Sequence, residues 1–229
     1  MKITYVEHSC FLIEYNGKTI ITDPFCTDEE RLKETLPQFF APDFILLTHG
    51  HHDHTGGLDL LQESAATVIG MVELIDLVQK KYPYLYGVGL NVGGKIDLGD
   101  GIEVSLVKAE HSSSFDEKYA GNAVGLIIKL GENVIYHAGD TALFSDMQLI
   151  DEYYKPNVGL LPIGGVYTMD VEQAKFACEK YFHFDTLIPM HYNTFPALKV
   201  NLSKLNDFTK KTTIKVLNPL ENTSFIDKI

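Results

Sequence analysis

The sequence predicts an α+β fold in which two β-sheets pack face to face and helices cover their outer sides. Apolar segments of strand length recur in both halves of the chain, and segments with helical periodicity alternate with them. No linker rich in proline, glycine or serine divides the two halves, which meet near residue 100. We therefore expect a single domain over residues 1–229, which is long enough to bury a substantial core.

The first half begins with three short strands, and Asn16-Gly17 between the last two is a typical two-residue hairpin turn. Pro24 ends the third strand, and Pro37 ends the helix that follows it. The elements expected in this half are strands over 2–6, 10–15, 18–22, 44–48 and 67–69, and helices over 27–36, from Leu58 and over 72–81.

The second half follows a segment rich in Gly, Tyr and Pro, 82–101, in which short strands and turns are expected. Gly131-Glu132 joins two strands as a hairpin, and Asp170 with Gln173 forms a capping-box-like pair before a helix. The elements expected here are strands over 102–108, 123–130, 133–137, 158–163, 186–190, 213–217 and 223–226, helices over 143–153, 170–181 and 198–209, and a polar loop over 112–122.

Composition and charge argue against several classes of protein. The formal net charge is −12 and there is no arm rich in Lys and Arg, so we expect no nucleic-acid partner. The longest apolar stretches, such as 124–130, are far shorter than a membrane span, and the N-terminus lacks the apolar region of a signal peptide. Cys10, Cys26 and Cys178 are scattered and odd in number, which suits free thiols. We expect a cytoplasmic protein that does not bind membranes and that could form a homo-oligomer.

Residues 49–54, His-Gly-His-His-Asp-His, place four histidines and one aspartate directly after an apolar strand. Imidazole and carboxylate groups at this density are ligands of zinc, manganese or iron. A polar loop that merely caps a strand and a helix is the alternative, but it would not require this spacing. His49 and His51 can face one metal, and Asp53 and His54 on the next turn can face a second.

Three further candidate ligands, His111, Asp140 and His191, each follow an apolar strand. A sheet edge holds such side chains toward one point, and a carboxylate such as Asp140 can span two metals about 3.5–4 Å apart. The alternatives are a turn histidine at 111 and a helix cap at 140. Asp23 either orients a metal-bound imidazole or simply ends its strand. His8 either faces the site as an acid or anion ligand, or caps the first hairpin.

Together these residues resemble the metallo-β-lactamase superfamily, and the resemblance covers nearly the whole chain. It rests on the motif at 49–54 with Gly56-Gly57, on His111, on Gly139-Asp140-Thr141 and on His191. Shorter matches are His8-Ser9-x-Phe11, Asp23-Pro24, Leu161-Pro162-Ile163-Gly164-Gly165 and Pro189-Met190-His191-Tyr192-Asn193. These are similar to the uncharacterised metal-dependent hydrolase branch of the superfamily, which is similar to L-ascorbate-6-phosphate lactonase and, more distantly, to N-acylphosphatidylethanolamine-hydrolysing phospholipase D.

The resemblance implies a four-layer αββα sandwich with two divalent metal ions at one edge between the sheets. It assigns the ligands as follows: His49, His51 and His111 to the first metal, Asp53, His54 and His191 to the second, and Asp140 to both. Zn²⁺ is the expected metal, and Mn²⁺, Fe²⁺ and Ni²⁺ share these ligands. The β-lactamases of the superfamily carry cysteine at the position of Asp140, so antibiotic hydrolysis is not expected. Glu7 replaces a glycine that is usual before His8, and His52 is an extra histidine that we do not expect to bind metal.

The expected function is hydrolysis of a small ester, lactone or phosphoester by a hydroxide that bridges two metals. Asp53 would hold the hydroxide and accept its proton, and His8 or a substrate group would protonate the leaving group. The alternatives are a phosphodiesterase or nuclease, a metal-binding sensor or scaffold without turnover, and a di-iron redox enzyme. His137 and His183 are expected to be structural, and contact between the 192–195 loop and substrate stays open.

Overall fold

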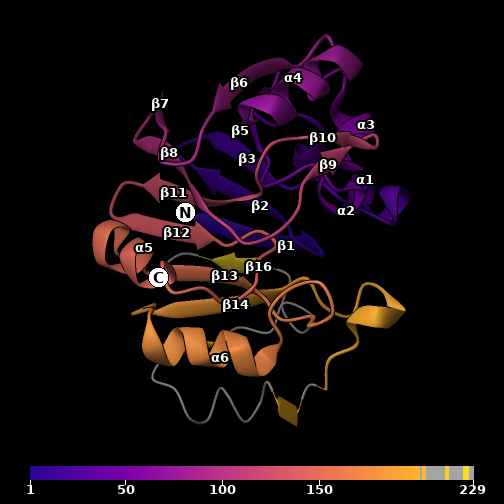
Figure 1. Ribbon diagram of the computed structural model, residues 1–229. Coiled ribbons are helices and arrows are strands. Elements are labelled where there is room, and N and C mark those ends of the chain that lie inside the picture. Colours follow the sequence, from indigo (N-terminus) through magenta and orange to yellow (C-terminus); the bar gives the residue numbers. More distant parts are fainter. Residues whose placement is uncertain (202, 205–214, 217–223, 227–229) are drawn as a thin grey trace.

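The two predicted sheets form the centre of the molecule, and helices lie outside both of them (Figure 1). The computed structural model describes residues 1–201, 203–204, 215–216 and 224–226. Sheet A has the strand order β16-β1-β2-β3-β4-β5-β6, and sheet B has the order β15-β14-β13-β12-β11-β8-β7. This is the expected αββα sandwich.

The strands of sheet A are β1 (Lys2–Glu7), β2 (Cys10–Tyr15), β3 (Lys18–Thr22), β4 (Phe44–Leu46), β5 (Thr67–Met71), β6 (Tyr86–Leu90) and β16 (Ser224–Ile226). Those of sheet B are β7 (Lys95–Gly99), β8 (Ile102–Lys108), β11 (Val124–Leu130), β12 (Asn133–His137), β13 (Val158–Pro162), β14 (Thr186–Met190) and β15 (Lys215–Val216). The helices are α1 (Glu29–Thr35), α2 (His52–Thr55), α3 (Leu58–Leu61), α4 (Val72–Lys81), α5 (Met147–Tyr154) and α6 (Val171–Lys180), with 3₁₀ turns η1 (Pro37–Phe40) and η2 (Pro196–Leu198).

Strand direction decides where the site lies. In sheet A, β1 and β3 both pair antiparallel with β2, and β4 pairs parallel with β3. In sheet B, β8 and β12 both pair antiparallel with β11, and β13 and β14 continue in parallel from β12. The residues that follow β1, β3 and β4, and those that follow β8, β12 and β14, therefore emerge at the same end of their sheet. Loops at this end can bring distant residues together.

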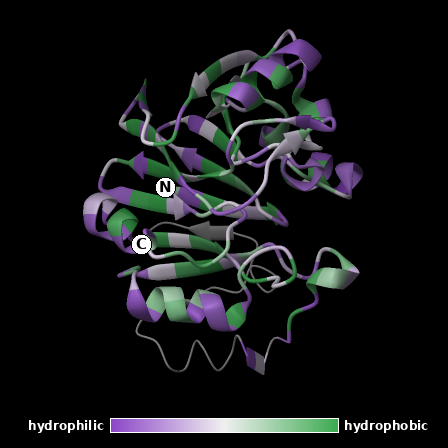
Figure 2. Cartoon of the chain, viewed as in Figure 1, coloured by the Kyte–Doolittle hydropathy of each residue, from purple (hydrophilic) through white to green (hydrophobic). Residues whose placement is uncertain are grey.

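The main core lies between the sheets and takes side chains from both. Phe11 and Ile13 of β2 belong to the same buried cluster as Leu126 and Ile128 of β11. A second buried cluster joins the outer face of sheet B to α5 and α6. Figure 2 shows hydrophobic residues concentrated along the central strands and hydrophilic residues on the outer sides of the helices. Burial on both faces explains the nearly continuous apolar strands of sheet B.

Most local predictions are confirmed. Asn16 and Gly17 both adopt positive φ, of 47° and 77°, as a hairpin turn requires. The side chain of Asp170 accepts a hydrogen bond from the backbone N–H of Gln173, and the Gln173 side chain returns one, which completes the capping box of α6. Among the described residues, no helix is long and apolar enough to cross a membrane.

The largest differences from the predicted boundaries occur in three segments. The 112–122 loop contains a short hairpin, β9 (Ser114–Phe115) and β10 (Lys118–Tyr119). The helix predicted over 143–153 begins only at Met147, and before it the backbone N–H of Ala142 donates to the carbonyl of Glu110 over 3.1 Å. In the segment predicted as a helix over 198–209, Leu198 ends the 3₁₀ turn η2, 199–201 are not helical and 203–204 are helical, while residues 202 and 205–209 lie outside the described part of the chain.

Candidate metal centre

The structure brings all seven predicted ligands together at one end of the sandwich. His49 follows β4 of sheet A, and the rest of its motif forms the short helix α2. His111, Asp140 and His191 follow β8, β12 and β14 of sheet B. These residues, with His8 after β1, form three overlapping groups in which the possible ligand atoms lie within 4.8 Å of one another.

The first group consists of the imidazoles of His49, His51 and His111. His49 Nε2 lies 2.9 Å from His51 Nδ1, and the His111 ring centroid lies 5.1 Å and 5.2 Å from those of His49 and His51. His51 is the N-cap residue of α2 with an extended backbone (ψ 152°), so it precedes the helical turn and its ring lies next to that of His49. Three imidazoles around one point are a typical zinc ligand set.

The second group consists of Asp53, His54 and His191, with His8 beside them. Asp53 and His54 lie in the single turn of α2, whereas His191 comes from sheet B. His191 Nε2 lies 3.8 Å from Asp53 Oδ2. The side chain of Asp53 is 29% exposed and that of His191 is 1% exposed. Asp53 is therefore the member of this group that faces solvent.

Asp140 lies between the two groups. Its Oδ1 lies 3.2 Å from His54 Nε2, and its Oδ2 lies 2.9 Å from His191 Nε2 and 3.6 Å from His111 Nε2. The alternative role as a helix cap is wrong, because the N-cap of α5 is Asp146. The carboxylate thus contacts ring nitrogens of both groups, as a bridging ligand would.

Asp23 orients His54 from behind. Its Oδ2 lies 2.7 Å from His54 Nδ1, and the carboxylate also accepts hydrogen bonds from the backbone N–H and the hydroxyl of Thr48. Because a carboxylate only accepts hydrogen bonds, Nδ1 carries a ring hydrogen, and Nε2 is the nitrogen at which a metal cation could replace a proton. The sequence did not predict that Thr48 holds Asp23. The only sequence feature that could have indicated it is the position of this threonine directly before the first histidine of the motif.

Three residues of the candidate metal centre have a strained backbone. His8, Asp23 and His191 all have positive φ, of 59°, 41° and 55°, which non-glycine residues rarely adopt. The backbone N–H of His191 donates to the carbonyl of His8 over 2.9 Å and so connects the two sheets here. Strain of this kind persists where surrounding contacts hold it, commonly at functional sites.

The electrostatics differ between the two groups. Burial lowers the pKa of His49, His51 and His111, so these rings stay neutral and keep their lone pairs. Burial also acts to lower the pKa of His54, but the carboxylates of Asp140 and Asp23 reverse this and hold it well above the usual value. Two buried carboxylates thus require positive charge at this position, which a metal cation would supply in place of the proton.

Unpartnered buried atoms support the same conclusion. Among the described residues, His54 Nε2, Asp140 Oδ1 and His191 Nε2 are buried and make no hydrogen bond. Buried polar atoms without partners are rare and costly in proteins. These three atoms belong to predicted ligands and lie close together, so the residues present fit a bound divalent cation.

The remaining histidines lie apart from this cluster. His52 is exposed on the outer side of α2. His137 donates from Nε2 to the carbonyl of Ser9 and accepts at Nδ1 from the backbone N–H of Gly139. His183 binds the carboxylate of Asp151, with Nδ1 at 2.6 Å from Oδ2. The last two make the structural contacts predicted for them.

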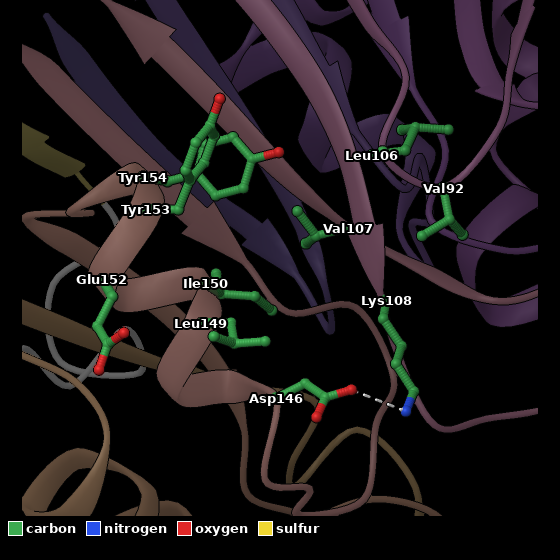
Figure 3. Close-up of a pocket in the computed structure, with 11 residues that line it drawn as sticks. Val92, Leu106, Val107, Lys108, Asp146, Leu149, Ile150, Glu152, Tyr153 and Tyr154 are labelled. Carbon is green, nitrogen blue, oxygen red and sulfur yellow. Dashed lines mark hydrogen bonds and ion pairs between the residues drawn. The ribbon is translucent and has the colours of Figure 1, made fainter.

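Two hollows are relevant to ligand binding. A polar pocket of about 290 Å³ adjoins the first group, and it is lined by Gly50, His51, His52, Thr55 and Gly56 together with Asp59, Lys81, Tyr82 and 114–117. A larger apolar groove of about 640 Å³ lies between α5 and β8, where the rings of Tyr153 and Tyr154 pack and Lys108 binds Asp146 (Figure 3). None of the predicted metal ligands lines this groove.

Fold and site together define a metal-dependent hydrolase of the αββα type. The family described as "Beta-lactamase superfamily domain" matches residues 2–191, and the chain belongs to the metallo-β-lactamase superfamily. It is 42% identical over 208 residues to a UPF0173 metal-dependent hydrolase of Paracoccus denitrificans (strain Pd 1222), covering 86% of this chain and 88% of that protein.

Solved structures agree with this assignment. Igni18, a novel metallo hydrolase from the hyperthermophilic archaeon Ignicoccus hospitalis KIN4/I, superposes with a TM-score of 0.83 at 38% identity over 99% of both chains. A metallo-β-lactamase fold protein from Bacillus subtilis superposes with a TM-score of 0.77 at 15% identity, over 98% of this chain and 99% of that one, which shows the shared fold.

Proposed function

We propose that this hydrolase cleaves a small, uncharged carboxylic ester or lactone at a pair of divalent cations. The first cation would be held by His49, His51 and His111, and the second by Asp53, His54 and His191, with Asp140 bound to both. Two separate groups of ligand atoms with one carboxylate between them support a dinuclear site. The imidazole-rich ligand set favours Zn²⁺.

Bound divalent cations lower the pKa of water and polarise a carbonyl oxygen, which is the chemistry that ester hydrolysis needs. The chain's own part falls to Asp53. Burial acts to raise the pKa of this carboxyl, but the imidazoles of His191 and His8 outweigh burial and keep it ionised. As the solvent-facing member of its group, Asp53 would accept a hydrogen bond from the attacking water and then its proton.

The charge around the site supports a carbonyl substrate over a phosphoester. The polar pocket beside His51 contains three carboxylates, Asp59, Asp116 and Glu117, against one cation, Lys81. The Lys81 ammonium is already bound to Asp116 at 3.2 Å. The whole chain has one arginine, Arg31, which lies in α1 away from this pocket's lining. A phosphate group would meet carboxylates here without the bidentate arginine that usually binds it.

The test is turnover by the Zn²⁺- or Mn²⁺-loaded protein of a panel of lactones, esters, thioesters and phosphodiesters. We expect the highest kcat/KM on an uncharged lactone or ester, and loss of one of two bound metals per chain in Asp53→Ala. A clear preference for phosphodiesters would contradict the proposed substrate. Failure to turn over any member would favour a sensor or scaffold, and two metals retained in Asp53→Ala would contradict the ligand assignment.

A further inference from the structure

His8 is enclosed at the end of β1, and both nitrogens of its ring have partners. The side chain is 0% exposed. Its Nε2 lies 3.1 Å from Asp53 Oδ2, and its Nδ1 lies 3.0 Å from the hydroxyl oxygen of Thr194. Neither nitrogen is therefore open to solvent or free to reach a leaving group.

The partners determine which nitrogen donates. The carboxylate of Asp53 only accepts hydrogen bonds, so Nε2 must carry a hydrogen. In the neutral ring Nδ1 then accepts, and the hydroxyl of Thr194 donates to it. The hydroxyl of Thr194 thus donates to His8, and His8 donates to the carboxylate of Asp53.

The ring is also fixed in place by its surroundings. The backbone of His8 is left-handed, and its carbonyl accepts the backbone N–H of His191 over 2.9 Å. The ring centroid lies 4.0 Å from that of His191, 5.6 Å from that of Phe25 and 5.5 Å from that of Phe195. A ring packed on three sides cannot turn away from Asp53 without moving these neighbours.

We propose that His8 is a positioning residue that holds the Asp53 carboxylate in its metal-binding orientation, and that Thr194 selects the required tautomer of His8. The inference rests on the proposed function, in which Asp53 serves the second metal. It gives His8 a different role from the proton donor expected in the sequence, because both ring nitrogens are occupied and buried. Hydrogen bonds to a ligating group typically change metal affinity by about 10–100-fold.

The experiment compares His8→Asn, Thr194→Val and the double variant with the wild type. Asparagine tolerates the left-handed backbone at position 8, but it is too short to span Thr194 and Asp53. The matched control is Thr4→Val, because the Thr4 hydroxyl is buried and makes no hydrogen bond. Zn²⁺ alone is titrated into metal-free protein against a chromophoric chelator, and long-range ¹H–¹⁵N NMR reads the His8 tautomer.

We expect His8→Asn to weaken binding of the second Zn²⁺ by roughly 10–100-fold and Thr194→Val to weaken it less. The double variant should match His8→Asn, because Thr194 acts through His8. Thr4→Val should bind like the wild type. In the wild type, the hydrogen of His8 should reside on Nε2.

A hydrogen on Nδ1, or wild-type Zn²⁺ affinity in both single variants, would overturn the inference. Unchanged Zn²⁺ affinity in His8→Asn, with loss of kcat and of the alkaline limb of the pH profile, would show a proton donor instead. If His8→Asn does not fold, the Zn²⁺ affinity of Thr194→Val alone tests the inference, and a wild-type value would overturn it. Weakened Zn²⁺ binding without turnover of any substrate would support the positioning role and contradict the proposed function.

Discussion

At the residue scale, the site depends on side chains that stand behind the ligands. Asp23 is fully buried and connects Thr48, at the end of the β4 region, with His54 in α2. Its hydrogen bond to His54 Nδ1 leaves Nε2 as the nitrogen that a metal could bind. Because such partners set the tautomer and basicity of an imidazole, their loss weakens metal binding even though they touch no metal.

We predict that Asp23→Asn lowers Zn²⁺ affinity by roughly 10–100-fold, because a neutral amide supports the His54 ring less well than a carboxylate. Competition with a chelator measures the effect. Asp100→Asn is the control: Asp100 is exposed and also left-handed, with φ 53°, so it tests the same substitution away from the site. Equal Zn²⁺ affinities in Asp23→Asn and Asp100→Asn would show that Asp23 does not support metal binding.

At the element scale, α2 carries Asp53 and His54, strand ends position the three distant candidate ligands, and the longer helices mainly stabilise the sheets. Each of the three distant ligands follows a strand whose direction places it at the common edge. Helix α6 covers the second buried cluster on the far side of sheet B, with Ala174 and Cys178 buried against it. Burial raises the pKa of the Cys178 thiol to about 12, so this cysteine stays protonated within the apolar contact.

Removing the cap of α6 should therefore reduce stability without changing the chemistry. We predict that Asp170→Ala lowers the free energy of unfolding by about 1 kcal/mol, which corresponds to roughly 2–4 °C in Tm for a chain of this size. Metal content should be unchanged. Asp170→Ser, which can still accept the Gln173 N–H, should recover most of the loss. No recovery of stability in Asp170→Ser would show that the effect does not come from capping.

At the scale of the whole molecule, a few polar contacts hold the two sheets in register at the site edge. His137, at the end of β12, donates to the carbonyl of Ser9, which precedes β2 of sheet A. The ring is fully buried, and burial lowers its pKa from the ordinary value of 6.5. Protonation at Nδ1 would also break the hydrogen bond from Gly139.

This contact makes stability depend on pH. The folded pKa lies below the unfolded value of 6.5, so below pH 6.5 the unfolded chain binds more protons and stability falls as the pH falls. We predict that His137→Gln reduces the stability loss of the metal-loaded protein between pH 7.5 and 5.5, by up to about 1.4 kcal/mol. Chemical denaturation at both pH values measures it. If His137→Gln loses as much stability as the wild type between these pH values, this histidine does not cause the pH dependence.

Metal removal should affect the whole fold. The cluster joins ligands from both sheets around two carboxylates, so without cations the edge contains unpartnered buried atoms. We predict that chelation lowers Tm by several degrees and that added Zn²⁺ restores it in a concentration-dependent manner, because a ligand that binds only the folded state stabilises it. A Tm unaffected by chelator, with metal loss verified, would contradict this.

The sequence by itself was enough for most elements, the superfamily and the seven candidate ligands, because strand periodicity, hairpin turns and motif spacing are local properties. Asn16-Gly17, the capping box at Asp170 and the spacing from His49 to His54 all report on neighbours within a few residues. Strand ends also identified His111, Asp140 and His191 once a metal site was expected. The resemblance added their division into two groups.

Only the tertiary structure decided how residues distant in sequence share hydrogen bonds. Both ring nitrogens of His8 have distant partners: Thr194 lies 186 positions away and Asp53 lies 45 positions away. No local sequence pattern could therefore distinguish a proton donor from a positioning residue. Local sequence encodes which atoms are available, whereas packing of the two sheets determines which of those atoms meet.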